Sequence, residues 1–398
     1  MGAGSASRFL SMTATSALRR VGATVIALLV TAVPATASAE PVRFALPAPT
    51  GSYPVGSVDL HLVDPDRHDP WVVGSPRELM ITVRYPARPN TEPKAPYMPA
   101  GVASTTAELD AGKLDIDPGL LDFRFPTHAG LGAPVAEGRW PVLLYSPGAT
   151  LSRAHGTVQM EQLASDGYIV VAIDHTHEAE AVAFPDNRVE RRALPAPTIE
   201  VSKRLITTRV QDIRFVLDQL ENVASGDNPG TQGRGLPAGL HTSLDLSRMG
   251  MFGHSAGGFT TGEVMTADHR IRAGADLDGS MAYSQSARDF GRVADDGLDR
   301  PFLLMSAGDH SAANDASWQQ FLATHRGPLC QVHLPDGEHF SYTDYQLLLP
   351  QLGEPDPTFV GTIDPTHSLA VQHRTLAAFF NTYLAAHGDR PAAPPYCT

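Results

Sequence analysis

Short runs of consecutive apolar residues alternate along the chain with stretches in which apolar residues recur every three or four positions. The apolar runs are typical of buried strands and occupy residues 78–87, 140–149 (with the turn that follows), 168–174, 248–252, 271–277, 301–307 and 329–334. The stretches with helical spacing cover residues 157–167, 202–223, 256–268 and 367–386. Continuous apolar strands separated by helices predict an α/β fold, with a mostly parallel sheet covered by helices on both faces.

Residues 86–136 break this pattern. They are rich in Pro, Ala and Gly and show no sustained periodicity. We therefore expect a surface insertion here, within a single domain that spans residues 40–398 and begins with an N-terminal extension. A second stretch, residues 221–239, is rich in turn-forming residues and is expected to be a long loop.

The first 39 residues differ in composition from the rest. They hold three arginines and no acidic residue, followed by an apolar run over residues 21–33 and the small residues Ala37 and Ala39. This pattern predicts a secretory signal peptide that is cleaved after Ala39, and therefore a secreted, extracellular protein. The apolar run is shorter than the roughly 20 residues that span a bilayer, which argues against an N-terminal membrane anchor. The general and twin-arginine export routes both stay open.

The formal net charge narrows the range of partners. It is −13 for the whole chain and, without the three arginines of the leader, −13 − 3 = −16. Such an acidic chain lacks the basic surface that nucleic acids require, so we expect no nucleic-acid partner.

The two cysteines, Cys330 and Cys397, both lie after the predicted leader. In an oxidising exterior we expect them to form a disulfide that ties the C-terminal tail to a late strand.

Candidate chemistry begins with "GHSAGG", residues 253–258. Ser255 lies where the predicted strand 248–252 reverses into the helix 256–268, and Gly253 and Gly257 remove the Cβ atoms that would collide in such a tight turn. A serine in a strained strand–turn–helix elbow is typical of a nucleophile, with the N–H of Ala256 directed at a developing oxyanion. The alternative interpretation is a glycine-rich turn in which Ser255 only caps the helix.

A serine nucleophile needs a histidine base and an acid. Among the sixteen histidines, His339 follows the strand 329–334 and a turn, which places it at the carboxyl edge of the sheet. Asp278 and Asp309 each end a strand at that same edge, so position in the chain leaves both open as the acid, whereas Asp276 is expected inside its strand. Other histidines are expected to have structural or surface roles: His254 pointing into the fold, His333 in a strand, and His367 and His373 in or near the last helix.

The stretch "DHTHEAE", residues 174–180, offers His175, His177 and Glu178 as possible metal ligands. No fourth ligand lies nearby in the sequence, so a structural hydrogen-bonding role is favoured, and we expect neither a metal nor a cofactor. Asp174 and His175 are also candidates to border the substrate pocket.

Five motifs, in this order along the chain, carry a resemblance: "PVLLYSPGAT", "LASDGYIVVAIDH", "GHSAGG", "ADLDGSM" and "GEHFSYTD". Together with "GSYPVGSVDLHLVDPDR" nearer the N-terminus, they resemble the platelet-activating-factor acetylhydrolase family of α/β-hydrolases, plasma and bacterial type. The resemblance covers most of residues 50–385 and implies the α/β-hydrolase fold.

The resemblance also implies roles for particular residues. In that family the acid lies in an L-D-x-x-M context, which favours Asp278 over Asp309, and the histidine loop corresponds to His339. The first oxyanion loop of the family usually reads S-H-G, whereas this chain has S-P-G at residues 146–148. We expect the backbone N–H of Ala149 to serve there as the second oxyanion donor, beside Ala256.

These assignments predict a secreted serine hydrolase that cleaves short-acyl lipid or phospholipid esters through an acyl-enzyme. A lipase- or cutinase-like hydrolase of triglycerides or polyesters is the main alternative, and a peptidase or a catalytically silent binding protein is a weaker one. The expected partners are a small or lipid ester substrate and, transiently, a lipid surface. The oligomeric state is left open.

Overall fold

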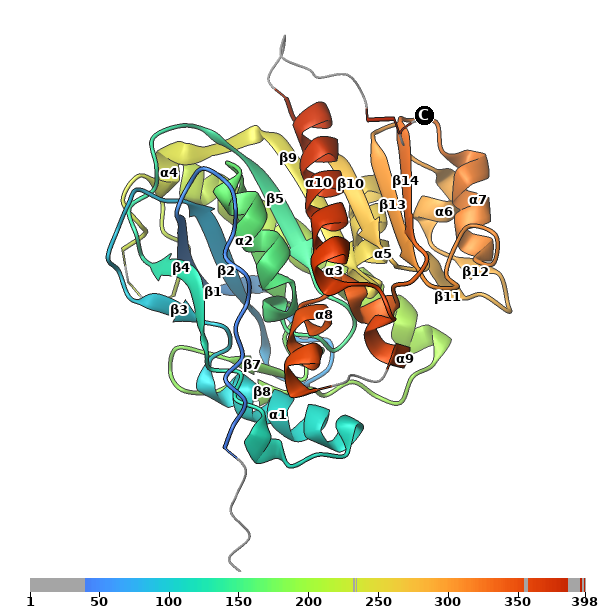
Figure 1. Ribbon diagram of the computed structural model, residues 1–398. Helices are drawn as coiled ribbons and strands as arrows, with labels where there is room; N and C mark the ends of the chain where they lie inside the picture. The colour runs from blue at the N-terminus through green and yellow to red at the C-terminus, as the bar shows by residue number, and fades with distance from the viewer. Residues whose placement is uncertain are drawn as a thin grey trace, which may run out of the picture. The chain divides into compact units, whose positions relative to one another are not determined.

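The computed structural model describes residues 40–231, 233, 235–353, 357–385, 394, 395 and 397 (Figure 1). The predicted signal peptide, residues 1–39, lies outside the described residues. Residues 40–398 group into one unit by their contacts. Within the described part of the chain, no helix has the length and apolar character needed to cross a membrane.

A ten-stranded sheet runs through the domain in the order β14-β13-β10-β9-β5-β6-β2-β1-β4-β3. Every pair from β14 to β6 is parallel, and β2 then pairs antiparallel with both β6 and β1. The strands of this sheet are β1 (Val55–His68), β2 (Pro76–Pro86), β3 (Lys94–Pro96), β4 (Pro126–Leu131), β5 (Trp140–Ser146), β6 (Ile169–Asp174), β9 (Leu244–His254), β10 (Ile271–Leu277), β13 (Phe302–Ala307) and β14 (Leu329–Leu334). The prediction of a mostly parallel sheet is confirmed.

Helices cover both faces of the sheet (Figure 1). The α-helices are α1 (Ala100–Leu114), α2 (Thr157–Ser165), α3 (Ile199–Ala224), α4 (Leu240–Ser243), α5 (Ala256–Ala267), α6 (Arg292–Asp296), α7 (Ala316–Thr324), α8 (Tyr345–Leu348), α9 (Pro357–Val360) and α10 (Pro365–Tyr383). The 3₁₀ helices are η1 (Pro118–Leu120), η2 (Arg153–Gly156), η3 (His339–Tyr342) and η4 (Leu349–Leu352), and two small hairpins pair β7 (Ala181–Ala183) with β8 (Val189–Arg191) and β11 (Ala282–Ser284) with β12 (Asp289–Phe290).

The two faces follow from the alternation of side chains along each strand. In β5, Val142 and Leu144 belong to the apolar cluster that includes side chains of α3 and α5. Leu143 and Tyr145 of the same strand belong to the cluster that includes side chains of α2 and α10. Burial on both faces explains why the central strands are apolar without interruption.

Residues 86–136, where the sequence shows no sustained periodicity, contain regular elements in the structure. This segment holds β3, α1 and β4, and α1 buries Val102, Ala103 and Ala107 in a cluster with Phe44 of the N-terminal extension. The apolar spacing of α1 was missed because its buried positions are mostly alanine and threonine, which a hydrophobic pattern does not mark.

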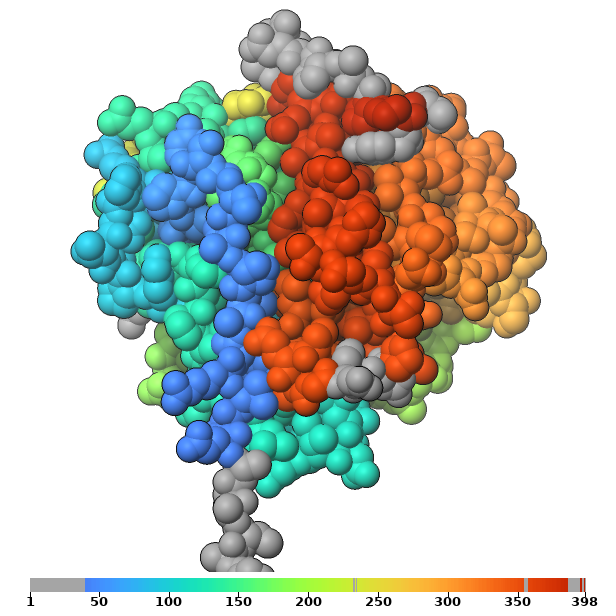
Figure 2. Space-filling view, in the orientation of Figure 1, coloured from blue at the N-terminus to red at the C-terminus, as the bar shows by residue number. Residues whose placement is uncertain are grey.

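The N-terminal extension lies against the outer surface of the helices on one face. Figure 2 shows this segment, in blue, running alongside α10. The N–H of Thr50 donates to Gln162 Oε1 (3.0 Å) and the N–H of Gly51 donates to Ser165 Oγ (3.1 Å), so the extension is fastened to α2.

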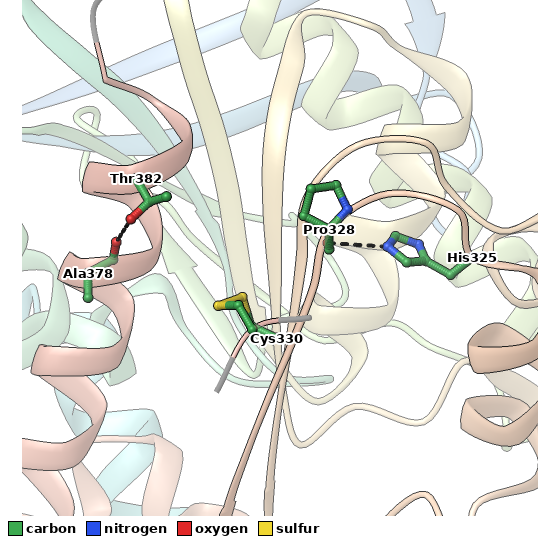
Figure 3. The surroundings of a disulfide bond; sticks show 6 residues. His325, Pro328, Cys330, Ala378 and Thr382 are labelled. Atoms are coloured by element: carbon green, nitrogen blue, oxygen red, sulfur yellow. Dashed lines mark hydrogen bonds between the residues drawn. A yellow bond between two sulfur atoms is a disulfide. The ribbon is translucent and has the colours of Figure 1, made fainter. Parts of the chain in front are cut away.

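The disulfide between Cys330 in β14 and Cys397 is present, which confirms the predicted pairing (Figure 3). Cys330 is fully buried, and the two cysteines are 67 residues apart in the sequence. Closing a loop of this length lowers the entropy of the unfolded chain, so we expect Cys397→Ser to lower the free energy of unfolding by about 2–4 kcal/mol.

Urea unfolding of the oxidised protein followed by circular dichroism measures this loss. The reduced wild-type protein is the control and should unfold at the urea midpoint of the variant. Equal midpoints for the oxidised wild-type protein and Cys397→Ser would contradict the expectation.

Candidate active site

Ser255 occupies a sharp turn between β9 and α5. Its backbone has φ 56° and ψ −122°, a left-handed conformation that is strained for a residue with a Cβ atom. The N–H of Ser255 donates to the carbonyl of Leu277 (2.9 Å), and its own carbonyl accepts from the N–H groups of Gly258 and Phe259. The predicted elbow is therefore present and is held by hydrogen bonds on both sides.

Close packing around this turn requires glycine at two positions. A Cβ atom on Gly253 would lie 2.3 Å from the carbonyl carbon of Gly257, and one on Gly257 would lie 1.9 Å from the carbonyl oxygen of Ser146. Both distances are far inside van der Waals contact. The glycines on either side of Ser255 thus let α5 approach β9 and β5, as the sequence pattern predicted.

Asp278 and His339 meet at the carboxyl edge of the sheet. Asp278 follows β10 with φ 62°, and its Oδ2 accepts a hydrogen bond from Nδ1 of His339 at 2.7 Å. The carboxylate is 3% exposed and the imidazole 43% exposed. Burial by itself raises the pKa of Asp278, but hydrogen bonds from His310 and His339 outweigh it and lower the pKa to about 2.

Ser255, Asp278 and His339 line a single pocket of about 560 Å³, together with Ala149 and Ala256. Pockets of this size accommodate small-molecule ligands. The structure therefore brings together all five residues that the sequence analysis assigned to the site.

Asp309, the alternative acid, lines the same pocket. Its side chain is exposed, and among the described residues it forms no hydrogen bond with His339. The geometry therefore favours Asp278 as the partner of the imidazole.

Arg209 of α3 holds the loop after β5 by hydrogen bonds to its backbone. The sequence analysis did not predict this residue. The guanidinium of Arg209 donates to the carbonyls of Pro147 (2.6 Å) and Gly148 (3.2 Å). In a trans peptide the C=O and the following N–H point in opposite directions, so fixing the carbonyl of Gly148 directs the N–H of Ala149 away from Arg209. At Ala256, the first residue of α5, the N–H has no acceptor within its helix and is likewise available to an oxyanion.

A buried network of charged groups lies next to this loop. It includes His175 and Glu178 of the "DHTHEAE" stretch, which gives these residues a structural role. Nε of Arg209 donates to both carboxylate oxygens of Glu178 (2.9 Å each). His175 bridges Ser146 Oγ (3.0 Å) and Asp212 Oδ2 (2.9 Å), and Asp212 also forms an ion pair with Arg77. Burying these charges is tolerated because each is paired.

Asp174 and His175 do not border the pocket, contrary to the alternative raised from the sequence. Both are fully buried, and Asp174 pairs with Arg153. His177 lies 3.3 Å from Glu190, so it too has a structural partner. Within the described ranges, no group of three or more His, Cys, Asp or Glu residues is arranged to hold a metal ion.

Two further histidines have the structural positions predicted for them. His254 is buried and points into the fold, where Nε2 hydrogen-bonds with the carbonyl of His339 at 2.9 Å. Burial, and then the neighbouring His339, lower the pKa of His254 to about 3. In β14, Nδ1 of His333 lies 2.9 Å from Ser306 Oγ.

His310 is a second residue that the sequence analysis missed. It comes directly after Asp309 at the end of β13, and its Nδ1 lies 2.9 Å from Oδ1 of Asp278. The signal was present in the sequence, because "GDHS" lies at the same sheet edge as Asp278 and His339.

Comparison with known proteins gives a consistent picture. The family described as "Platelet-activating factor acetylhydrolase, isoform II" matches residues 117–392. A "Probable 1-alkyl-2-acetylglycerophosphocholine esterase" from Arthroderma benhamiae is 28% identical over 350 residues, covering 79% of this chain and 80% of that protein. A "Platelet-activating factor acetylhydrolase" from Cavia porcellus is 22% identical over 360 residues, covering 85% of this chain and 78% of that protein.

Among solved structures, the chain is similar to a ferulic acid esterase from Streptomyces cinnamoneus. The TM-score is 0.69 with 32% sequence identity, and the match covers 91% of this chain and 99% of that chain. The fold is that of the α/β-hydrolases, with the parallel part of the sheet and the Ser255 elbow in the arrangement described above.

Proposed function

Because the chain belongs to the platelet-activating factor acetylhydrolase, isoform II, family of carboxylic ester hydrolases, we propose that it is a secreted serine esterase whose catalytic triad is Ser255, His339 and Asp278. One observation carries this assignment. The imidazole of His339, held at 2.7 Å by the buried Asp278, lines the same pocket as the strained Ser255. This arrangement supports the assignment of nucleophile, base and acid, because activation of a serine hydroxyl requires a histidine that is oriented by a carboxylate.

The geometry leads to a two-step hydrolysis. Ser255 Oγ attacks the ester carbonyl carbon while Nε2 of His339 accepts the hydroxyl proton. Asp278 accepts the hydrogen bond from Nδ1–H, which fixes the tautomer and stabilises the imidazolium. His339 then protonates the leaving alcohol, and an acyl group remains on Ser255. Water, deprotonated by the same imidazole, releases the acid and restores the enzyme.

The N–H groups of Ala149 and Ala256 are proposed to stabilise the tetrahedral oxyanion. Each such donor contributes about 3 kcal/mol of transition-state stabilisation in serine hydrolases. Arg209 supports this role because it holds the carbonyl of Gly148, the group bonded directly to the N of Ala149.

We propose short-acyl lipid or phospholipid esters as the substrate class. Support comes from two relatives, whose names describe esterases that act on acetyl-bearing lipid substrates. A second candidate is an ester of an aromatic acid. The similar solved structure is a ferulic acid esterase. In this chain Phe259 and Tyr283, whose ring centroids are 5.2 Å apart, line the pocket and offer aromatic surface to such a substrate.

Hydrolysis rates on p-nitrophenyl esters of increasing acyl length test the main candidate. We expect kcat/KM to be highest for acetyl and butyryl esters and to fall by at least about tenfold at longer chains, the loss that follows when roughly 1.4 kcal/mol of transition-state binding is removed. A strong preference for long chains would contradict the proposal and favour a lipase-like enzyme. Methyl ferulate, assayed in parallel, would favour the second candidate if it were the better substrate.

Secretion is supported by two features. The leader has the charge, apolar run and small residues of a signal peptide. The Cys330–Cys397 disulfide is of the kind that persists in an oxidising compartment.

A further inference from the structure

His310 lies between two buried carboxylates. Its Nδ1 is 2.9 Å from Oδ1 of Asp278, and its Nε2 is 3.0 Å from Oδ2 of Asp315. The imidazole is 22% exposed, whereas the carboxylates of Asp278 and Asp315 are 3% and 4% exposed. Trp318 packs against the imidazole, with ring centroids 4.6 Å apart.

Both nitrogens of this ring face an acceptor. An ionised carboxylate accepts hydrogen bonds and cannot donate one, and a neutral imidazole has a single N–H. A neutral His310 would therefore direct a nitrogen lone pair at one of the two carboxylates. Only the imidazolium, with two N–H groups, satisfies both contacts, and hydrogen bonds between charged partners are the stronger kind.

We propose that His310 is a positioning residue that acts as an imidazolium cation, clamping the acid Asp278 to Asp315 and thereby offsetting part of the negative charge that Asp278 presents to His339. The inference rests on the triad proposed above and extends it by a fourth and a fifth residue. His310 does not touch the reacting atoms, and its effect reaches them only through Asp278.

The far end of the clamp is rigid because Asp315 caps a helix. Its Oδ1 accepts from the N–H groups of Ser317 (2.8 Å) and Trp318 (3.0 Å) at the start of α7. The side-chain amide of Gln285 also donates to this oxygen (2.7 Å). With Oδ1 fully engaged, Oδ2 is left to hold His310 in one position.

At Asp278, the other carboxylate that His310 contacts, hydrogen bonds fix the orientation of the acid. Oδ1 of Asp278 accepts from the N–H of Ala307 (2.9 Å) and from His310, while Oδ2 accepts from His339. Because two donors hold Oδ1, the carboxylate cannot rotate freely about its Cβ–Cγ bond. Oδ2 is therefore presented to the imidazole of His339.

Charged and titratable groups surround His310 on several elements. Asp278 and Asp315 touch it, and His339 is the other imidazole on Asp278. Asp276 is buried nearby in β10, where burial raises its pKa well above the usual value. Asp309 and Glu338 lie at the same pocket and are acidic.

The charged groups that surround His310 are thus carboxylates, together with the imidazole of His339 when it is protonated. Burial lowers the pKa of His310, but the hydrogen bonds from Asp278 and Asp315 outweigh it and raise the pKa to about 10. Since the folded-state pKa is raised, the cation is present throughout the neutral range and is lost as the pH rises through about 10.

The cation of His310 changes the electrostatic effect of Asp278 on His339. It offsets part of the carboxylate charge that faces the imidazole of His339. Replacing His310 by a neutral residue leaves two carboxylates without their shared cation, and the larger uncompensated negative charge then favours the charged form of the neighbouring imidazole.

The pH profile of kcat/KM for His310→Gln tests this effect. We expect the acid limb to move to higher pH by about one unit. The positive charge of His310 is separated from the imidazole of His339 only by the carboxylate of Asp278, and losing a charge at that separation has an effect of this order. His325→Gln is the matched control, since His325 is similarly half-buried, but its Nε2 lies 3.3 Å from the carbonyl of Pro328, beside the disulfide (Figure 3), and the structure records no ion pair for it among the described residues. Its profile should superimpose on that of the wild-type protein, and an unshifted acid limb in His310→Gln would overturn the proposal.

A second measurement does not depend on activity. In ¹⁵N-histidine-labelled Ser255→Ala protein, NMR should show a histidine with both ring nitrogens protonated at pH 8 and titrating near pH 10. Adding His310→Gln should remove that signal, whereas a signal from His177, which also lies between two carboxylates, should stay. If adding His310→Gln removes no such signal, His310 is not a cation and the proposal fails. This result is separable from the triad proposal, which fails instead if Ser255→Ala keeps its esterase activity.

Discussion

Ser255→Ala is expected to abolish esterase turnover, lowering kcat by about 10⁶-fold, as removal of the nucleophile does in other serine hydrolases. The reason is chemical. The methyl group of alanine cannot form the acyl-enzyme, and only the oxyanion donors and substrate binding remain to assist direct attack by water. Stopped-flow assays with p-nitrophenyl acetate measure the loss, and the initial burst of p-nitrophenol should vanish with it.

A matched control separates loss of the nucleophile from loss of structure. Ser284 lies in β11 outside the pocket lining, where its hydroxyl lies 3.3 Å from Ser286 Oγ and accepts from the N–H of Ala287 (3.2 Å). We expect Ser284→Ala to keep wild-type turnover, and both variants to show wild-type circular dichroism. A folded Ser255→Ala protein that retained appreciable turnover would show that another group is the nucleophile.

Asp278→Asn is expected to lower kcat by about 10⁴-fold with little change in structure. An asparagine amide at this position can donate to Nδ1 of His339 and so stabilise the tautomer in which Nε2 carries the proton. That nitrogen then cannot accept the hydroxyl proton of Ser255. Steady-state kinetics on a short-chain ester measures the effect.

Asp309→Asn is the comparison that distinguishes the two candidate acids. Because the Asp309 side chain is exposed and makes no hydrogen bond with His339 among the described residues, we expect this variant to keep most of its activity. The opposite pattern, in which only Asp309→Asn loses turnover, would show that Asp278 is not the acid.

Much of the site is predictable from local sequence because it depends on local constraints. The Ser255 elbow requires glycine within two residues on either side, and the uninterrupted apolar strands mark a sheet that is buried on both faces. Strand ends then identify the catalytic edge, which predicts His339 and limits the acid to Asp278 or Asp309.

The choice between Asp278 and Asp309 needed more than local sequence. Both follow parallel strands at the same edge, and the spacing treats them alike. In the structure, Asp278 adopts φ 62° and its side chain returns toward His339, whereas Asp309 follows Gly308 at φ 54° and its side chain is exposed. Resemblance to a family, and not spacing, favoured Asp278.

Arg209 and His310 could not be predicted from the sequence, for a different reason. Arg209 lies 61 residues from Gly148 and His310 lies 32 residues from Asp278, and neither pair belongs to a recurring motif. Their roles depend on which buried groups face one another across elements. A hydrophobic pattern carries no information about such contacts, and it likewise fails to predict α1, whose buried face is made mostly of alanine and threonine.

Mass spectrometry of a trapped covalent adduct tests the central claim most directly. After reaction with a fluorophosphonate, the wild-type protein should gain the mass of one phosphonyl group, and proteolysis should place it on the peptide that contains Ser255. Ser255→Ala should gain none. An adduct on a different residue, or equal labelling of the two proteins, would contradict the claim that Ser255 is the activated nucleophile.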